Sequence, residues 1–597
     1  MARVALILLA ASLWAGLARA AEIPDAELNR APTPERVAAL QTEAAVAGWP
    51  AVAAELHRAA LGLYKKKGTQ AQAWYYLYRW AMLFGQTERE AIERWSHAIE
   101  EAPINRANMP KAFVGSEHPL ADFAPPELRA YMMESFDFSN QFFTMLTPLD
   151  RTPAVFFILG LLWTHNPVEF REYANLALAI AIVDDVPPPP DWPHGQVNAQ
   201  VLPRKLPAPL DLFIFLTESS RKGALLQPLA KLPASELKFV VDTVAGFQEM
   251  LWAQQKVHVE LPELGKIYDH VRYRRDRFDN RIYQWPKPSY QLPDILAEGG
   301  ICVDQAYFAS MIGKAKGVPT LLFRGFGLDG THAWFGYLDG GGHWQLDCGR
   351  YADQKFMVGY AFDPQTWMNI SDHELQFLSE GFRRQPLYTA SITHMQFADL
   401  FFFDGDFPGA AKAARAAVDI ERRNLEAWFI LVAALQRMGS PPQQVEGSLQ
   451  EASIAFLKYP DVDAEFKRRL ARNLRARGET SQADFIERGM AHKYEGSRED
   501  VTANEAWSIL RRSMENDDVA ACTRTYTGVL KSFGSGTGMD FFARVVRPFV
   551  EYLLKKDQPR EALQAVERAR AAMRVQPKSQ LEQEFHALED RIHQALH

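Results

Sequence analysis

The sequence has little cysteine and no apolar run long enough for a membrane, and both absences exclude whole classes of protein. Three cysteines, Cys302, Cys348 and Cys522, occur in 597 residues, so disulfides do not form the scaffold of the fold. After the first twenty residues, an apolar run such as 155–163 is too short to cross a bilayer. We therefore expect no integral membrane segment in the mature chain.

An excess of one charge is also missing. Lys and Arg together number 66 and Asp and Glu 73, which gives a formal net charge of −7. Nucleic-acid binding depends on an excess of Lys and Arg that neutralises phosphates. The chain is mildly acidic, so we expect no nucleic-acid partner. Zinc sites use paired cysteines or His-x-x-x-His spacing, and a set made of His332, His343 and Cys348 has neither. We expect no metal and no cofactor.

The first twenty residues are typical of a secretory signal peptide. Arg3 precedes an apolar stretch from Val4 to Trp14, and Ala18-Arg19-Ala20 has the Ala-x-Ala form of a cleavage site. No cysteine follows directly after that site, so we expect no lipid anchor. The protein is predicted to be exported, and therefore either secreted or periplasmic.

The remaining chain divides into three regions, and the predicted fold class is α+β. Residues 21–255 are predicted to form a mainly helical N-terminal domain, 256–390 the core that carries the chemistry, and 391–597 a series of helical repeats. Prolines that begin at Val186-Pro187-Pro188 predict an ordered, extended strap over 186–209. Apolar spacing predicts one long amphipathic helix over 236–257.

Two glycine-rich stretches imitate nucleotide-binding loops. Residues 325–330 have the Gly-x-Gly-x-x-Gly spacing, but that motif needs a helix after it and here a predicted strand follows. Residues 533–538 lack the lysine of a phosphate-binding loop. We interpret the first stretch as a tight loop that leads to His332, and the second as a loop between helices.

The C-terminal region resembles tetratricopeptide repeats. The residues at matching spacing are Gly405, Phe407, Ala410, Ala417, Asn424, Ala427, Trp428, Leu431 and Gly439, and then Ala562, Ala569 and Pro577. Small residues let paired helices approach closely, and neighbouring units must stack to bury their faces. The resemblance implies a surface for a protein partner, and plain structural support is the alternative.

Cys302 stands at the predicted start of a helix. Gly299-Gly300 predicts a turn, the stretch from Cys302 to Lys316 favours a helix of about four turns, and Gly317 with Pro319 ends it. Free N–H groups and the positive end of the helix dipole favour a thiolate at that position. A small buried cysteine is the alternative interpretation.

His332 and Asp347 belong to two predicted strands, 331–338 and 343–348. Asp339-Gly340 predicts a two-residue hairpin turn, which would place His332 directly opposite Asp347 with their Cβ atoms about 4.5–5.5 Å apart. A four-residue turn would keep both on one face, and only an odd loop length would separate them. A carboxylate in that place would orient the imidazole; a surface ion contact is the alternative.

Four short blocks occur in the order known from one family of enzymes: Gly300 with Cys302 and Ala306, then Gly317-Val318-Pro319, His332-Ala333-Trp334, and Trp344 with Asp347. They resemble the transglutaminase-like superfamily of papain-type thiol enzymes over roughly residues 261 to 360. The resemblance implies an α+β core in which Cys302 is the nucleophile, His332 the base and Asp347 the orienting acid. Members often continue after the acid with proline, whereas Cys348-Gly349 follows here.

One donor for an oxyanion is the backbone N–H of Cys302. Gln284 or Trp285 could supply another, although packing against the helix is the interpretation we favour for that aromatic cluster.

These expectations describe an exported thiol hydrolase or acyl transferase that acts on amide bonds through a Cys-His-Asp triad. We favour a cysteine peptidase with a peptide or protein substrate, because water needs no second binding site. One alternative is a non-catalytic scaffold or binding protein that keeps the same module. The other is a transferase that joins amines to the glutamine side chains of proteins.

Overall fold

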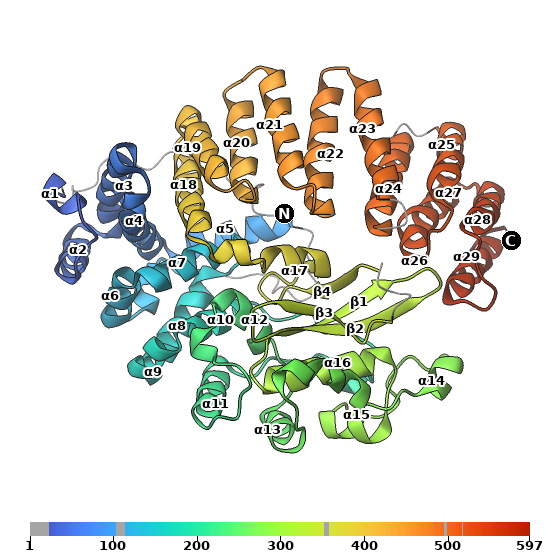
Figure 1. Cartoon of the computed structure of the whole chain (residues 1–597), viewed down its shortest axis with the longest axis horizontal. Helices are drawn as coiled ribbons and strands as arrows, with labels where there is room; N and C mark the ends of the chain where they lie inside the picture. Colours follow the sequence, from blue (N-terminus) through green and yellow to red (C-terminus); the bar gives the residue numbers. More distant parts are fainter. Residues whose placement is uncertain (1–22, 103–113, 352–356, 495–497, 516–517, 597) are drawn as a thin grey trace.

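Helices make up most of the chain, and one small sheet lies near its centre (Figure 1). The structure is a computed structural model that describes residues 23–102, 114–351, 357–494, 498–515 and 518–596. The predicted signal peptide, residues 1–20, lies outside the described residues.

The N-terminal region is helical, as predicted, and most of its helices pack into one large hydrophobic core. All residues from Leu176 to Val183 are buried, because this segment is apolar on every side and must be enclosed. Among the described residues, no helix is both long and apolar enough to cross a membrane. The helices are α1 (Asp25–Leu28), α2 (Pro34–Ala47), α3 (Trp49–Lys67), α4 (Gln72–Gly85), α5 (Glu88–Glu101), α6 (Pro126–Glu134), α7 (Phe136–Met145), α8 (Thr152–His165), α9 (Pro167–Glu172), α10 (Ala174–Val183) and α11 (Pro209–Arg221).

The helix predicted over 236–257 is interrupted in the structure, so that prediction is wrong. Helix α12 (Ala234–Val241) ends before Asp242, and α13 (Phe247–Lys256) begins after Gly246. The carboxylate of Asp242 forms a buried ion pair with Lys314, whose ammonium group also donates to the carbonyls of Phe239 and Thr320 at 2.7 Å. A buried ammonium group needs such partners, and the break in the helix supplies two of them.

The proline-rich segment 186–209 connects the N-terminal helices to the core. Trp192, His194 and Val197 are buried within it. Trp192 packs edge-on against Trp367, with ring centroids 5.3 Å apart. The carbonyl of Gln196 accepts a hydrogen bond of 3.1 Å from the backbone of Trp285. The strap is therefore an integral part of the packing around the core.

The sheet has five antiparallel strands in the order β3-β2-β1-β4-β5. They are β1 (Thr320–Phe326), β2 (Thr331–Leu338), β3 (Trp344–Cys348), β4 (Gly359–Phe362) and β5 (Asn369–Ser371). On one face, Ala333, Phe335 and Tyr337 belong to the same core as helix α16 (Cys302–Ala315). On the other face, Phe323 and Trp334 form a separate cluster. Helices α14 (Arg275–Asp279) and α15 (Leu292–Glu298) lie beside α16 (Figure 1).

The hairpin between β2 and β3 does not have the predicted two-residue turn. Leu338 pairs with Trp344, which leaves five residues in the loop. The backbone N–H of Asp339 donates to the carbonyl of His343 at 2.9 Å, and the Asp339 carboxylate accepts from the amides of Gly341 and His343. A bulge in the β2–β3 pairing then shifts the register between Phe335 and Tyr337. The loop length is odd, but the bulge adds a second shift, so Asp347 falls opposite Gly336 and is displaced along the strand from His332.

In the part of the chain that the structure describes, helices α18 to α29 follow the core. Successive helices pack in chain order from α18 to α25 and again from α27 to α29, as in a helical-repeat array. Ala410, Ala417 and Ala427 are fully buried where the first helices meet, which confirms the predicted repeat-like packing. The series arches over the sheet, with α17 (Asp372–Leu378) between them (Figure 1). The helices are α18 (Pro386–Phe403), α19 (Phe407–Ile420), α20 (Leu425–Arg437), α21 (Pro442–Ala455), α22 (Pro460–Ala476), α23 (Thr480–Lys493), α24 (Glu499–Glu515), α25 (Val519–Phe533), α26 (Met539–Phe541), α27 (Arg547–Lys555), α28 (Pro559–Met573) and α29 (Gln580–Leu596).

Candidate active site

Helix α16 begins at Cys302, as the sequence predicts. Gly299 before it has φ +77°, a conformation that favours glycine. Gly300 lies so close to Asp304 that a Cβ atom would collide with that side chain. The Asp304 carboxylate accepts a hydrogen bond of 2.9 Å from the backbone N–H of Ile301 and so caps the helix. The position of Cys302 at the helix tip therefore depends on two glycines and one buried acid.

Asp304 also connects the helix tip to the segment that precedes it. It forms an ion pair of 2.9 Å with Arg277 and accepts a hydrogen bond of 2.8 Å from the hydroxyl of Tyr290. Arg277 in turn donates to the carbonyl of Gln284 at 3.1 Å. Trp285 is buried against Tyr290, with ring centroids 5.1 Å apart, which is the packing role we favoured. This network ties residues 283–284 through Arg277 to the first turn of α16.

The sulfur of Cys302 lies against strand β2. Burial raises the pKa of the Cys302 thiol to about 11, and the nearby Asp304 carboxylate acts in the same direction. The backbone amides of Ala333, Val303 and Cys302 itself act in the opposite direction and lower the pKa. Burial raises the pKa by more than the helix terminus lowers it. Cys302 is therefore a neutral thiol at pH 7, and not the thiolate that its position in the sequence favours.

This raised pKa predicts how Cys302 reacts with iodoacetamide. Only the thiolate reacts, so the labelling rate should be low at pH 7 and rise about tenfold per pH unit up to a pKa of about 11. Cys348 should follow a similar curve, because burial raises the pKa of its thiol to about 12. Mass spectrometry of each cysteine peptide over pH 7–10 measures both rates. A Cys302 rate that is already constant above pH 7 would contradict the neutral thiol.

His332 is buried at the start of β2 and is held by a backbone carbonyl. Its Nε2 lies 2.8 Å from the carbonyl oxygen of Gly349. A carbonyl only accepts, so Nε2 carries the proton, and the neutral ring has its lone pair on Nδ1. The ring stacks with Trp334 at 6.0 Å and tilts against Tyr351 at 5.2 Å between centroids. Ala333 belongs to the core that contains α16, whereas His332 stacks with Trp334 of the cluster on the other face of the sheet.

Asp347 is not beside His332, so the predicted pairing of these two side chains is wrong. The side chain of Asp347 is 59% exposed and forms an ion pair of 2.9 Å with Arg350. The five-residue loop and the bulge put Phe335 opposite Cys348, which moves Asp347 along the strand and away from the imidazole. Of the three predicted residues, Cys302 and His332 line the same cavity, and Asp347 lies at the surface.

Gly349 and Tyr268 are site residues that the sequence reasoning missed. Gly349 has φ +93°, and a Cβ atom there would lie 2.5 Å from the ring of Tyr268, so only glycine fits. The Tyr268 hydroxyl donates to the carbonyl of Ala333 at 2.9 Å. Tyr268 therefore supports both the strand that contacts Cys302 and the carbonyl that binds His332. The one sequence signal was Cys348-Gly349, where the family often has proline.

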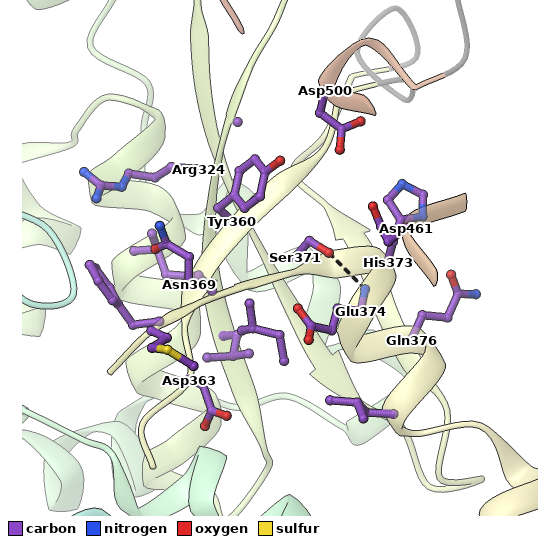
Figure 2. A pocket seen from close by; sticks show the side chains of 18 of the residues that line it. Arg324, Tyr360, Asp363, Asn369, Ser371, His373, Glu374, Gln376, Asp461 and Asp500 are labelled. Atoms are coloured by element: carbon purple, nitrogen blue, oxygen red, sulfur yellow. Dashed lines mark hydrogen bonds between the residues drawn. The ribbon is translucent and has the colours of Figure 1, made fainter. Parts of the chain in front are cut away.

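Cys302 and His332 line a cavity of about 1150 Å³. Its walls include β1, β4, β5 and α17 from the core, and α20, α22 and α24 from the repeats. Figure 2 shows that Arg324 lies to one side of Tyr360, and that Asp461 and Asp500 approach from the other side. The repeats therefore form part of the wall of the candidate active site.

The C-terminal end of the repeats is also hydrogen-bonded to the loop that leads to His332. The backbone N–H of Met539 donates to Gly327 at 3.0 Å, and that of Leu581 donates to Asp329 at 3.1 Å. The Gln580 side chain accepts from the backbone N–H of Thr331 at 2.9 Å. The two glycine-rich stretches thus meet, because the loop before α26 packs against the loop between β1 and β2.

Gly538→Ala should separate these two loops. A Cβ atom at Gly538 would lie 2.5 Å from the Gly327 carbonyl and would also collide with Leu328. We expect faster hydrogen exchange at the amides of Met539 and Leu581 than in the wild type. Gly528→Ala is the matched control, because its Cβ would meet nothing within 4 Å and alanine favours the helix. Equal exchange in both variants would show that the contact does not hold the loop.

Metal binding has no support in the described ranges, where no three His, Cys, Asp or Glu side chains are arranged to hold an ion. No protein-family model matches this sequence, and no curated protein matches it. Among solved structures, the chain is similar to one in the crystal structure of the APC/C hetero-tetramer Cut9-Hcn1, with a TM-score of 0.18 and 11% identity over 93% of this chain and 92% of that chain. A likeness at this level supports no conclusion about fold or function.

Proposed function

We propose that this protein is an exported thiol-dependent hydrolase of amide bonds, a cysteine peptidase with a transglutaminase-like core, in which Cys302 is the nucleophile and His332 the base. One observation carries the proposal. Cys302 at the tip of α16 and His332 at the start of β2 both line one cavity, and helix α16 packs against β2.

In this mechanism the thiol proton moves to Nδ1 of His332 as the sulfur attacks the amide carbonyl. The leaving amine takes that proton, the C–N bond breaks, and a thioester forms. Water then adds to the thioester and gives a carboxylic acid, and the sulfur regains its proton. The Gly349 carbonyl stabilises the charged imidazole through Nε2. Because the His332 ring stacks with Trp334 on the face of the sheet opposite α16, it must turn toward Cys302 when substrate fills the cavity.

A specific observation favours a second candidate, a non-catalytic module that binds peptides. Burial keeps Cys302 protonated, and the predicted orienting acid lies at the surface. The repeats that wall the cavity suit protein binding in either case.

A digest experiment separates the candidates. Wild type and Cys302→Ala are each incubated with a denatured protein mixture, and new termini are counted by mass spectrometry. New termini made only by the wild type support the peptidase. Identical digests would reject it in favour of the binding module. A labelled amine found on glutamine side chains would instead indicate transfer.

A further inference from the structure

The proline-rich strap contributes a buried histidine that is linked to the start of α16. His194 is fully buried, and its Nε2 lies 3.2 Å from the hydroxyl oxygen of Tyr290. That hydroxyl donates its hydrogen to the carboxylate of Asp304 at 2.8 Å. A phenol has a single hydrogen, so its oxygen accepts from His194, and Nε2 carries the proton. The three side chains therefore form a series of hydrogen bonds from the strap to the first turn of the helix.

Asp304, the last member of this series, acts directly on the residues around Cys302. It stands two residues after Cys302 in the same helical turn. Its carboxylate accepts a hydrogen bond of 2.9 Å from the backbone N–H of Ile301, the residue before the cysteine. Its charge also raises the pKa of the Cys302 thiol. A residue that holds Asp304 in place can therefore affect the candidate nucleophile from a distance.

The bond to Tyr290 is the one contact that distinguishes a histidine at position 194 from an apolar ring. Burial and the charges of Arg204 and Arg324 lower the pKa of His194 well below its ordinary value, so the ring is neutral at pH 7. Its Nδ1 is buried and has no hydrogen-bond partner among the residues that the structure describes. A phenylalanine of similar shape would avoid the cost of that nitrogen. What the histidine adds is the hydrogen bond to Tyr290.

A second strap residue fixes the ring of Tyr290. The guanidinium of Arg204 lies 5.2 Å from the ring centroid of Tyr290 and 5.0 Å from that of Tyr307, in the second turn of α16. The two tyrosine rings are 4.9 Å apart, and the ring of His194 packs edge-on against both, at 5.5 and 5.6 Å. Tyr290 is therefore held between the strap and α16, with its hydroxyl directed at Asp304.

We propose that His194 is a positioning residue, which acts through Tyr290 and Asp304 to hold the tip of α16, and with it Cys302, in the arrangement that reaction requires. The strap then belongs to the candidate active site as well as to the packing around the core. The effect of His194 on cleavage rests on the proposed function, whereas its effect on the thiol of Cys302 does not.

The test compares four variants of the full chain: His194→Phe, His194→Gln, Tyr290→Phe, and the double variant of His194→Phe with Tyr290→Phe. Phenylalanine keeps a ring and loses the donor, whereas glutamine keeps an N–H group near the position of Nε2. Amide hydrogen exchange at Ile301 measures how firmly the helix tip is held. Alkylation of Cys302 by iodoacetamide at pH 8, followed by mass spectrometry, measures how much of the thiol is ionised.

We expect both rates to rise about fivefold or more in His194→Phe and in Tyr290→Phe, since each loses a buried hydrogen bond. A looser helix tip admits water, and burial is what keeps the pKa of the Cys302 thiol high. His194→Gln should stay within about twofold of the wild type, because it keeps a donor. The double variant should match Tyr290→Phe within about twofold, because a residue that acts through another adds nothing once the other is removed.

Val197→Ala is the matched control. Val197 is buried in the same strap, and its substitution removes packing without removing any of these hydrogen bonds. It should change both rates by less than about twofold. An equal rise in Val197→Ala, wild-type rates in a folded His194→Phe, or rates in the double variant well above those of Tyr290→Phe would overturn the proposal.

Peptide cleavage by the wild type and by His194→Phe is measured in parallel. A lower kcat with an unchanged KM in His194→Phe would support a role in positioning the nucleophile. Cleavage, exchange and alkylation that all stay at the wild-type rates would overturn this inference and leave the peptidase intact. Faster exchange and alkylation in His194→Phe, with no cleavage even by the wild type, would support the positioning role and reject the peptidase.

Discussion

His332→Ala and Cys302→Ala should each lower the rate of peptide cleavage by at least about 10³-fold, whereas Asp347→Asn should lower it by less than about threefold. Replacing an acid that orients a catalytic histidine by its amide lowers kcat about 10⁴-fold. Asp347 cannot have that role from its observed position, because its carboxylate is bound to Arg350 at the surface. Initial rates at one peptide concentration measure all three variants.

This experiment distinguishes two ways of holding the imidazole. If the Gly349 carbonyl orients His332, the side chain at 347 is dispensable. A loss of about 100-fold or more in Asp347→Asn, with unchanged folding, would show that the carboxylate moves to the ring when substrate binds. It would remove Gly349 from the mechanism and restore the predicted triad.

Sequence patterns predicted the local elements of the core well, because each depends on neighbouring residues. The glycines at 299 and 300 place the start of α16 at Cys302. Alternating aromatics over 331–338 predict β2, whose bounds the structure confirms. The small residues at 410, 417 and 427 predict close helix packing in the repeats, and all three are buried. In each case the element is predicted by a local pattern: a glycine turn, alternating apolar side chains or helical spacing of small residues.

The register of the β2–β3 hairpin could not be predicted in the same way. Asp339-Gly340 is a strong signal for a two-residue turn, but two more glycines follow it and permit a longer loop. The Asp339 carboxylate then decides the outcome, because it binds the amides of Gly341 and His343. A bulge adds a second shift. Whether His332 meets Asp347 depends on these two details, and neither has a distinct pattern in the sequence.

Contacts between distant parts of the chain were the other features that sequence reasoning missed. Tyr268 lies 65 residues before Ala333, whose carbonyl it binds. Gln580 lies 249 residues after Thr331. Such pairs leave no periodic signal, since neither partner is unusual for its own element. The two glycine-rich stretches did indicate close approach of the backbone, but only the structure shows that they approach each other.

Asp304→Ala should destabilise the protein by about 3–5 kcal/mol, the range expected when one partner of a buried ion pair is removed. Asp304 is completely buried and binds Arg277, Tyr290 and the backbone of Ile301. The substitution leaves the Arg277 guanidinium, which is 4% exposed, without its counter-charge. Urea denaturation gives the free energy of unfolding, provided that the transition is two-state or that the core melts as one step.

Two controls separate the loss of this pair from a general effect of removing an acid. Asp276→Ala removes an exposed carboxylate that pairs with Arg274 nearby in the sequence, and it should leave the free energy of unfolding unchanged. Arg277→Met combined with Asp304→Leu removes both charges and should recover part of the stability, because no charge is then left unpaired. If Asp304→Ala costs less than about 1 kcal/mol, water must enter and solvate Arg277. The helix tip at Cys302 would then be open to solvent, and the pKa of its thiol would fall toward the ordinary range.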